Sequence, residues 1–246
     1  MRLRTIFASL AILVFSTSVA FADTRFNQVK PNEFDPAKSH LVQGAWLAGI
    51  GCPTEVKAQV FQPPNYNTTA EETITDPACP TGDGKDKHTE GLLLAKTGPT
   101  ANNASATAEL KGVKGITLTE LGYDIRKTAA GDARGSHCGA GAPRFNVETS
   151  DGLFGIGCNS PPADSAEIGT GWLRLRWGGT CAPACPLMGF KDFVTLAPVT
   201  GDVKSITIIF DEGQDALGAP DNFGLAVLDN IDVNGTLIGR GPTDAD

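Results

Sequence analysis

The chain contains few of the residues on which catalytic and metal centres depend. It has three histidines, His40, His88 and His137, and they are far apart in the sequence. It also lacks a G-x-S-x-G elbow, an H-E-x-x-H pair, a phosphate-binding loop and a dinucleotide-binding fingerprint. We therefore favour a non-catalytic protein. A hydrolase remains the alternative, because catalytic partners need not be neighbours in sequence.

Positive charge is scarce as well. The chain has 20 lysines and arginines against 28 aspartates and glutamates, which gives a formal net charge of −8. Binding to nucleic acid depends on clustered cations. We therefore expect no nucleic-acid partner, and we expect the surplus of acids to favour solubility outside the cell.

Long apolar runs are absent after the N-terminus. Arg2 and Arg4 precede the run IFASLAILVF, and the small-residue ending AFA follows. This order is typical of a secretory signal peptide at 1–22, cleaved after Ala22. No later run approaches the ~20 apolar residues of a membrane helix, so we expect no transmembrane segment in the mature protein. The expected location is secreted, periplasmic or at the cell surface.

Six cysteines follow the signal peptide, and an even number in an oxidising compartment predicts disulfides. A zinc site built on the CAPAC thiolates is the alternative, but the scattered histidines and the expected export argue against it. Neighbourhood in the sequence favours three pairs, which are Cys52 with Cys79, Cys138 with Cys158, and Cys181 with Cys185.

Short runs of alternating polar and apolar residues, separated by Gly, Pro and Asp turns, cover most of the chain, and no segment has a sustained helical period. This pattern predicts an all-β antiparallel sandwich stabilised by disulfides. We expect one domain at 40–241, an N-terminal arm at 23–39, a flexible tail at 242–246 and a long loop at 68–90. The predicted strands are 41–53, 56–61, 91–96, 105–113, 115–127, 143–158 as a hairpin, 171–177, 193–199, 203–210 and 222–235.

Three of these segments carry local expectations. In 115–127 the apolar residues change parity, which predicts a β-bulge near Glu120. In 143–158 we expect Asp151 and Gly152 to form the hairpin turn. In 222–235 five apolar residues share one parity with Asp229, so one carboxylate is expected on the apolar face of this closing strand. These five are Phe223, Leu225, Val227, Ile231 and Val233.

Three predicted strands carry polar residues on the parity opposite their apolar residues. If these strands share a sheet, their outer faces form a strip of guanidinium, amide, carboxylate and indole groups. Such a strip suits sugars, because planar donors and acceptors match hydroxyl pairs and an aromatic face covers the apolar side of a pyranose ring. The alternative is an ordinary solvated face. The candidate ligand-binding residues are Asp124, Arg126, Arg144, Asn146, Trp172, Arg174 and Arg176.

A carboxylate on an apolar face needs a hydrogen-bond partner or a cation. Asp229 is therefore a candidate ligand for a structural calcium ion, with Asp211 as a second candidate. The alternative is that Asp229 accepts hydrogen bonds from neighbouring loop amides, and we favour it because the sequence offers no complete ligand set. We expect no other cofactor.

The segments SITIIFDEG and LDNIDVNG resemble the closing strands of jelly-roll modules in secreted bacterial proteins, the carbohydrate-binding and galactose-binding-like sandwiches. The runs CGAGAPRFNVETSDG and GWLRLRW also resemble uncharacterised exported bacterial proteins. The first resemblance implies a jelly-roll-like fold and a structural calcium ion at Asp229. We therefore expect a secreted, non-catalytic binding module for carbohydrate or a cell-surface polymer, with a structural or adhesive surface protein as the alternative.

Overall fold

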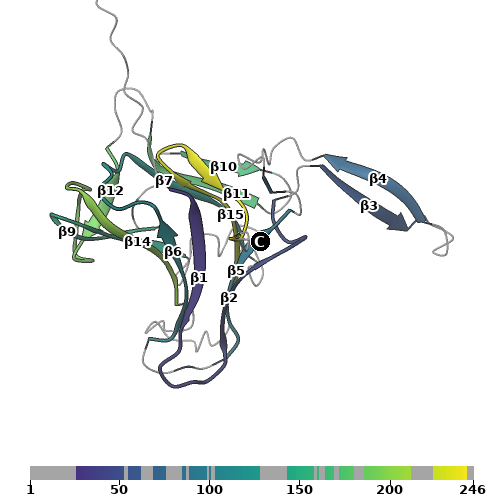
Figure 1. The fold of residues 1–246 in the computed structure, drawn as a ribbon, viewed down its shortest axis with the longest axis horizontal. Helices are drawn as coiled ribbons and strands as arrows, with labels where there is room; N and C mark the ends of the chain where they lie inside the picture. The colour runs from purple at the N-terminus through teal and green to yellow at the C-terminus, as the bar shows by residue number, and fades with distance from the viewer. Residues whose placement is uncertain are drawn as a thin grey trace, which may run out of the picture.

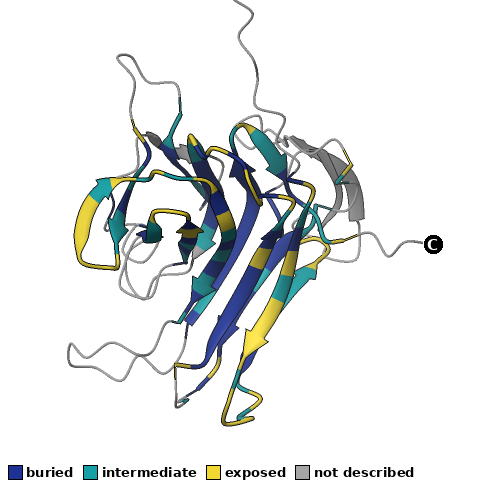
Figure 2. Cartoon of the chain, turned by 60° about the vertical axis from the view of Figure 1, so that its left-hand side comes forward, coloured by how far each residue is buried: buried dark blue, intermediate teal, exposed yellow. Residues whose placement is uncertain are grey.

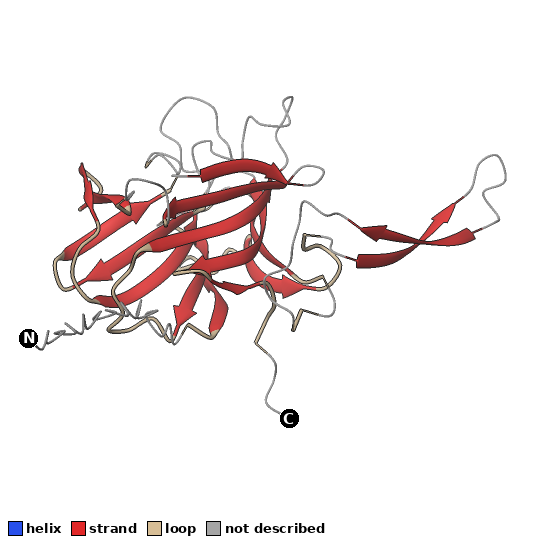
Figure 3. Cartoon of the chain, turned by 90° about the horizontal axis from the view of Figure 1, so that it is seen from above, coloured by secondary structure: helices blue, strands red, loops and turns tan. Residues whose placement is uncertain are grey.

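Two antiparallel sheets make up most of the described chain (Figure 1). All of the regular elements are β-strands, as the alternating sequence pattern predicts (Figure 3). Within the described ranges no helix is long and apolar enough to cross a membrane. The structure is a computed structural model, and it describes residues 26–52, 55–61, 69–75, 85–86, 89–98, 100, 103–127, 143–157, 160, 164–168, 172–179, 186–211 and 224–242.

The first sheet, sheet A, has the strand order β1-β6-β14-β8-β9-β12-β13, so β1 and β13 are its edges. Its strands are β1 (Gln28–Phe34), β6 (Ser105–Lys111), β14 (Val203–Phe210), β8 (Arg144–Thr149), β9 (Gly152–Ile156), β12 (Met188–Lys191) and β13 (Thr195–Pro198).

The second sheet, sheet B, has the order β10-β11-β7-β15-β5-β2, and β16 pairs with β15. Its strands are β10 (Asp164–Ile168), β11 (Trp172–Gly178), β7 (Glu120–Lys127), β15 (Gly224–Val233), β5 (Gly91–Lys96), β2 (Val42–Leu47) and β16 (Thr236–Ile238).

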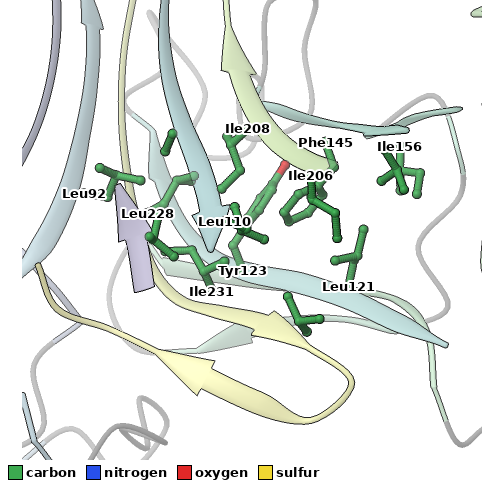
Figure 4. Packing of buried hydrophobic residues seen from close by; sticks show 14 of the residues in the cluster. Leu92, Leu110, Leu121, Tyr123, Phe145, Ile156, Ile206, Ile208, Leu228 and Ile231 are labelled. Atoms are coloured by element: carbon green, nitrogen blue, oxygen red, sulfur yellow. The ribbon is translucent and has the colours of Figure 1, made fainter. Parts of the chain in front are cut away.

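The apolar faces of sheets A and B pack against each other in a sandwich-like arrangement (Figure 4). The rings of Tyr123 and Trp177 from sheet B and Phe145 from sheet A pack against one another. The hydroxyl of Tyr123 donates a 2.6 Å hydrogen bond to the backbone oxygen of Pro143, which satisfies the polar end of this buried ring. Burial is greatest along the central strands, and exposed residues gather at edges and turns (Figure 2).

One pair of edge strands brings the two sheets together. β1 lies beside β2, and the indole N–H of Trp46 donates a 2.9 Å hydrogen bond to the backbone oxygen of Val29. A Cβ at Gly44 would lie 2.9 Å from the backbone oxygen of Asn32, so the close approach requires glycine. The prediction of an arm at 23–39 is therefore wrong for β1, which tolerates Pro31 because it is an edge strand.

A separate two-stranded hairpin is formed by β3 (Glu55–Phe61) and β4 (Thr69–Thr75). It stands away from the two sheets in Figures 1 and 3. The predicted loop at 68–90 is wrong over β4. The threonine-rich run TAEETIT has high β-propensity, but the Gly and Pro residues that follow it dominate the composition of the whole segment.

Two local predictions also need correction. The predicted bulge near Glu120 is wrong, because β7 begins at Glu120 and its register with β11 has no shift. The apolar residues change parity at the start of the strand and not within it. The apolar residues before that point are buried without pairing into a strand. The turn between β8 and β9 comes one residue earlier than predicted, at Ser150 and Asp151.

Cys52 is buried and disulfide-bonded. Its partner lies outside the described residues, as do the signal peptide at 1–22 and the other predicted disulfide residues. The three predicted pairings therefore stay predictions for Cys79, Cys138, Cys158, Cys181 and Cys185.

Candidate functional site

The seven candidate ligand-binding residues lie on the outer faces of two different sheets. Five of them come from β7 and β11, which are neighbours in sheet B. The other two, Arg144 and Asn146, come from β8 in sheet A. The condition for a single strip, that all three strands share one sheet, is not met, because alternation shows which residues share a face of a strand but not which strands pair.

On sheet B the central residue is Asp124, whose side chain is fully buried. Arg174 lies directly opposite on β11 and holds both carboxylate oxygens, with Nε 2.9 Å from Oδ1 and Nη2 2.8 Å from Oδ2. Asn230 of β15 donates from Nδ2 to Oδ2 over 2.9 Å. The carboxylate therefore connects three adjacent strands through charge-assisted hydrogen bonds.

Arg176 extends this contact to a second carboxylate. Its Nη1 lies 3.4 Å from Oδ1 of Asp124, and its Nε lies 3.0 Å from Oδ2 of Asp232. Gly122 is the partner of Arg176 across the strands, and a Cβ there would overlap the arginine side chain. Glycine at this position therefore gives the guanidinium its path between the two acids.

A β-bulge in β15 turns its carboxylates to the outer face. The register with β7 shifts between Asp229 and Asp232, and Asn230 has a left-handed backbone with φ of 45°. Ala226 and Leu228 face the core before the bulge, and Ile231 and Val233 face it after. The predicted single apolar face of 222–235 is therefore wrong, and both aspartates lie on the side opposite the main core.

Asp229 accepts hydrogen bonds from two backbone amides. The N–H of Cys52 lies 2.7 Å from Oδ2, and the N–H of Asn230 lies 2.6 Å from Oδ1. Burial raises the pKa of the carboxyl well above its usual range, and these two donors act in the opposite direction. The structure thus shows the amide contacts that we favoured for Asp229 over a calcium ion.

Asp211, the second candidate metal ligand, follows β14 of sheet A and pairs with Arg144 instead. Nη1 and Nη2 of Arg144 each lie 2.8 Å from one carboxylate oxygen. Among the residues that the structure describes, no three or more histidine, cysteine, aspartate or glutamate side chains are grouped to hold a metal ion.

Trp172 is the indole of the predicted sugar platform, and it is only 2% exposed. It packs with Cys52 and Val227 in a small apolar cluster outside the main core. The guanidinium of Arg126 lies 5.4 Å from the ring centroid. On the outer faces of β7 and β11 the described side chains therefore make internal polar and cation–π contacts, and the indole of Trp172 is covered.

The outer face of sheet A offers a second group of residues. Asn146 faces outward, because the residues on either side of it in β8 face the core. The register places it beside Gly155 of β9, then Phe190 of β12, then Leu196 of β13. We call these four residues the sheet A row. Oδ1 of Asn146 is buried and has no hydrogen-bond partner in the described part of the chain.

The ring of Phe193 lies over the glycine of this row. A Cβ at Gly155 would be 2.7 Å from Cδ1 and Cε1 of the ring, so the glycine leaves the space that the ring occupies. Phe193 is nevertheless 48% exposed, Val194 is 78% exposed and Leu196 is 42% exposed. An aromatic ring accessible to solvent thus lies over the cross-strand neighbour of Asn146.

Sequence reasoning missed Phe193 as a surface residue, because it predicts a strand over 193–199. β13 starts only at Thr195 and pairs with β12, whose sequence MGFK has no clear alternation. Asp192 and Phe193 form the turn, with left-handed φ values of 51° and 58°. The turn residue Asp192 was the available signal, since aspartate tolerates this backbone. Phenylalanine rarely adopts it.

The structure predicts that Asp124 stabilises sheet B through its charge. Asp124→Asn leaves Arg174 and Arg176 facing a neutral amide, so we expect the free energy of unfolding in urea to fall by about 3 kcal/mol. Glu148→Gln is the matched control, because it breaks an exposed 3.5 Å pair with Lys204. We expect less than about 0.5 kcal/mol for the control. Equal losses in the two variants contradict this role for Asp124.

The second prediction concerns pH. Burial raises the pKa of Asp232 to about 7; a hydrogen bond with Glu120 adds to the rise, while Arg176 lowers it. The pKa of this carboxyl is higher in the folded protein than in the unfolded chain, so the proton binds the folded state more tightly. The protonated carboxyl therefore adds to the free energy of unfolding, and this addition is lost as the pH rises to about 7. Asp232→Asn does not titrate. Its unfolding free energy relative to the wild type should therefore increase by roughly 2 kcal/mol between about pH 5 and about pH 8.

Chemical denaturation at the two pH values measures this difference. Asp202→Asn is the control, because Asp202 is an exposed carboxylate. If the stability of Asp232→Asn follows that of the wild type across the pH range, the raised pKa is wrong.

Comparison with known proteins does not assign the chain to a family. No protein-family model matches the chain, and no curated protein is similar to it in sequence. The contacts of the described residues are therefore the basis for a functional conclusion.

Proposed function

We propose that the protein is an exported, non-catalytic binding module for carbohydrate or a cell-surface polymer, and that the ligand lies on the outer face of sheet A. The observation that carries this proposal is the exposed ring of Phe193, which lies over Gly155 in the same row as Asn146. Such a ring can cover the apolar side of a sugar while a neighbouring amide meets its hydroxyl groups.

The polar groups near this ring support binding rather than catalysis. Arg144 is fixed by its two contacts with Asp211, so its planar group is held in place at little further entropic cost. Glu148, a carboxylate on the same strand as Asn146, lies next to Lys204. A hydrolase needs a carboxyl whose proton affinity is tuned for transfer, and paired surface carboxylates do not meet that need.

The finer features of the fold belong to the same proposal. We infer a jelly-roll arrangement of the sandwich and three disulfides that staple it after export. The disulfide-bonded state of Cys52 supports the oxidising compartment. The burial of Cys52 beside Trp172 supports a structural role for that bond.

A structural or adhesive surface protein is the second candidate. Its supporting observation is the position of Val194 and Leu196, both exposed, at the free edge strand of sheet A. Edge strands with apolar side chains tend to pair with other chains. Pro198 ends β13 and lacks an amide hydrogen, which limits such pairing. We therefore rank this candidate below ligand binding.

Binding to a panel of soluble polysaccharides, measured by calorimetry, tests the proposed function. Phe193→Ala removes the ring, and we expect it to weaken binding between about twofold and about tenfold. Val194→Ala is the matched control, because it truncates the next, more exposed apolar residue. Unchanged binding in Phe193→Ala contradicts the site, and so does an equal loss in Val194→Ala.

A further inference from the structure

The amide of Asn146 contains a polar atom that the fold does not satisfy. Oδ1 is buried and accepts no hydrogen bond from any described residue. Most buried polar atoms in folded proteins have a partner, because an unpaired acceptor costs the free energy of its lost hydration. A β-strand position on an outer face does not itself require an amide, so the cost at Asn146 calls for an explanation.

The surroundings of this atom indicate what kind of group can pair with it. Gly155 is the cross-strand neighbour of Asn146 and carries no side chain, and Phe193 fills the space above it. Phe193 belongs to a turn, and its ring is about half exposed. The ring therefore lies over the position directly across the strands from Asn146.

Two of the basic side chains near the row are paired with acids. Arg144 and Asp211 neutralise each other at 2.8 Å, and Lys204 lies 3.5 Å from Glu148. A surface that recognises an anionic polymer presents arginines or lysines whose charge is available to the ligand. This region supplies instead an uncharged acceptor beside an aromatic ring.

We propose that Oδ1 of Asn146 accepts a hydrogen bond from a hydroxyl group of a neutral sugar ring, whose apolar side stacks on Phe193. The inference rests on the proposed function and narrows its ligand from carbohydrate or surface polymer to neutral saccharide. Asn146 is then a specificity-determining residue. Without a ligand its unpaired Oδ1 lowers the stability of the fold, and with a ligand the same atom accepts the hydrogen bond of a hydroxyl group.

Two variants of one residue test the proposal. Asn146→Leu keeps the size of the side chain but removes the acceptor, and Asn146→Asp keeps an acceptor oxygen. With a soluble neutral glucan or galactan as the probe, we expect Asn146→Leu to weaken binding by about five- to tenfold. Asn146→Asp should stay within about threefold of the wild type. The wild type should bind these probes more tightly than anionic polygalacturonate, with little dependence on salt.

Thermal unfolding separates this role from a structural one. Asn146→Leu removes the unpaired acceptor, so we expect its melting temperature to rise by about 2–4 °C while its binding weakens. A hydrogen bond within the fold would instead make the variant less stable. Unchanged binding in Asn146→Leu overturns the proposal, as does a lower melting temperature or a preference for polygalacturonate.

The same measurements distinguish two kinds of failure. If Phe193→Ala weakens binding and Asn146→Leu does not, the proposed function stands and the role of Asn146 is wrong. If the wild type binds none of the polysaccharides, the proposed function is wrong and this inference is wrong with it.

Discussion

The carboxylate of Asp124 on β7 holds the centre of sheet B together, because side chains from the two neighbouring strands contact it. Arg174 reaches it from β11 and Asn230 reaches it from β15, while Asp124 itself belongs to β7. Charged groups that are buried together stabilise a fold only when each retains its partner. The bulge at Asn230 is part of this constraint, since it turns both flanking aspartates to the same face.

The outer faces of the two sheets differ in how their polar and aromatic side chains are used. On sheet B Asp124 and Asp232 pair with Arg174 and Arg176, and Trp172 is covered. On sheet A an aromatic ring remains open to solvent over the cross-strand neighbour of Asn146, whose Oδ1 has no partner among the described residues. Sites that bind ligands often retain such unsatisfied or strained features, whereas packing and hydrogen bonding remove them elsewhere. This contrast is the physical reason for our proposal that a ligand binds on sheet A.

Alternation in the sequence predicted most of the longer strands but not their neighbours, and it did not predict β1, β4, β10, β12 or β16. It correctly separated the buried residues Phe145 and Leu175 from the polar residues of β8 and β11, because side-chain period is a local property. It missed the bulge in β15, where apolar residues flank the acids on both parities. It also missed the turn at Phe193, where hairpin geometry overrides the β-propensity of an aromatic residue. The pairing of Arg144 with Asp211 depends on tertiary structure and had no local signal.

The most direct test of the central claim is a map of the ligand contacts by NMR. A titration of isotope-labelled protein with a neutral oligosaccharide reports which backbone and side-chain amides change their environment. We expect the largest chemical-shift changes at Gly155, Phe193 and the side-chain amide of Asn146, with little change at Asp124 and Arg174. Changes centred on Arg174 and Trp172, with a silent sheet A row, would contradict the placement of the binding site on sheet A.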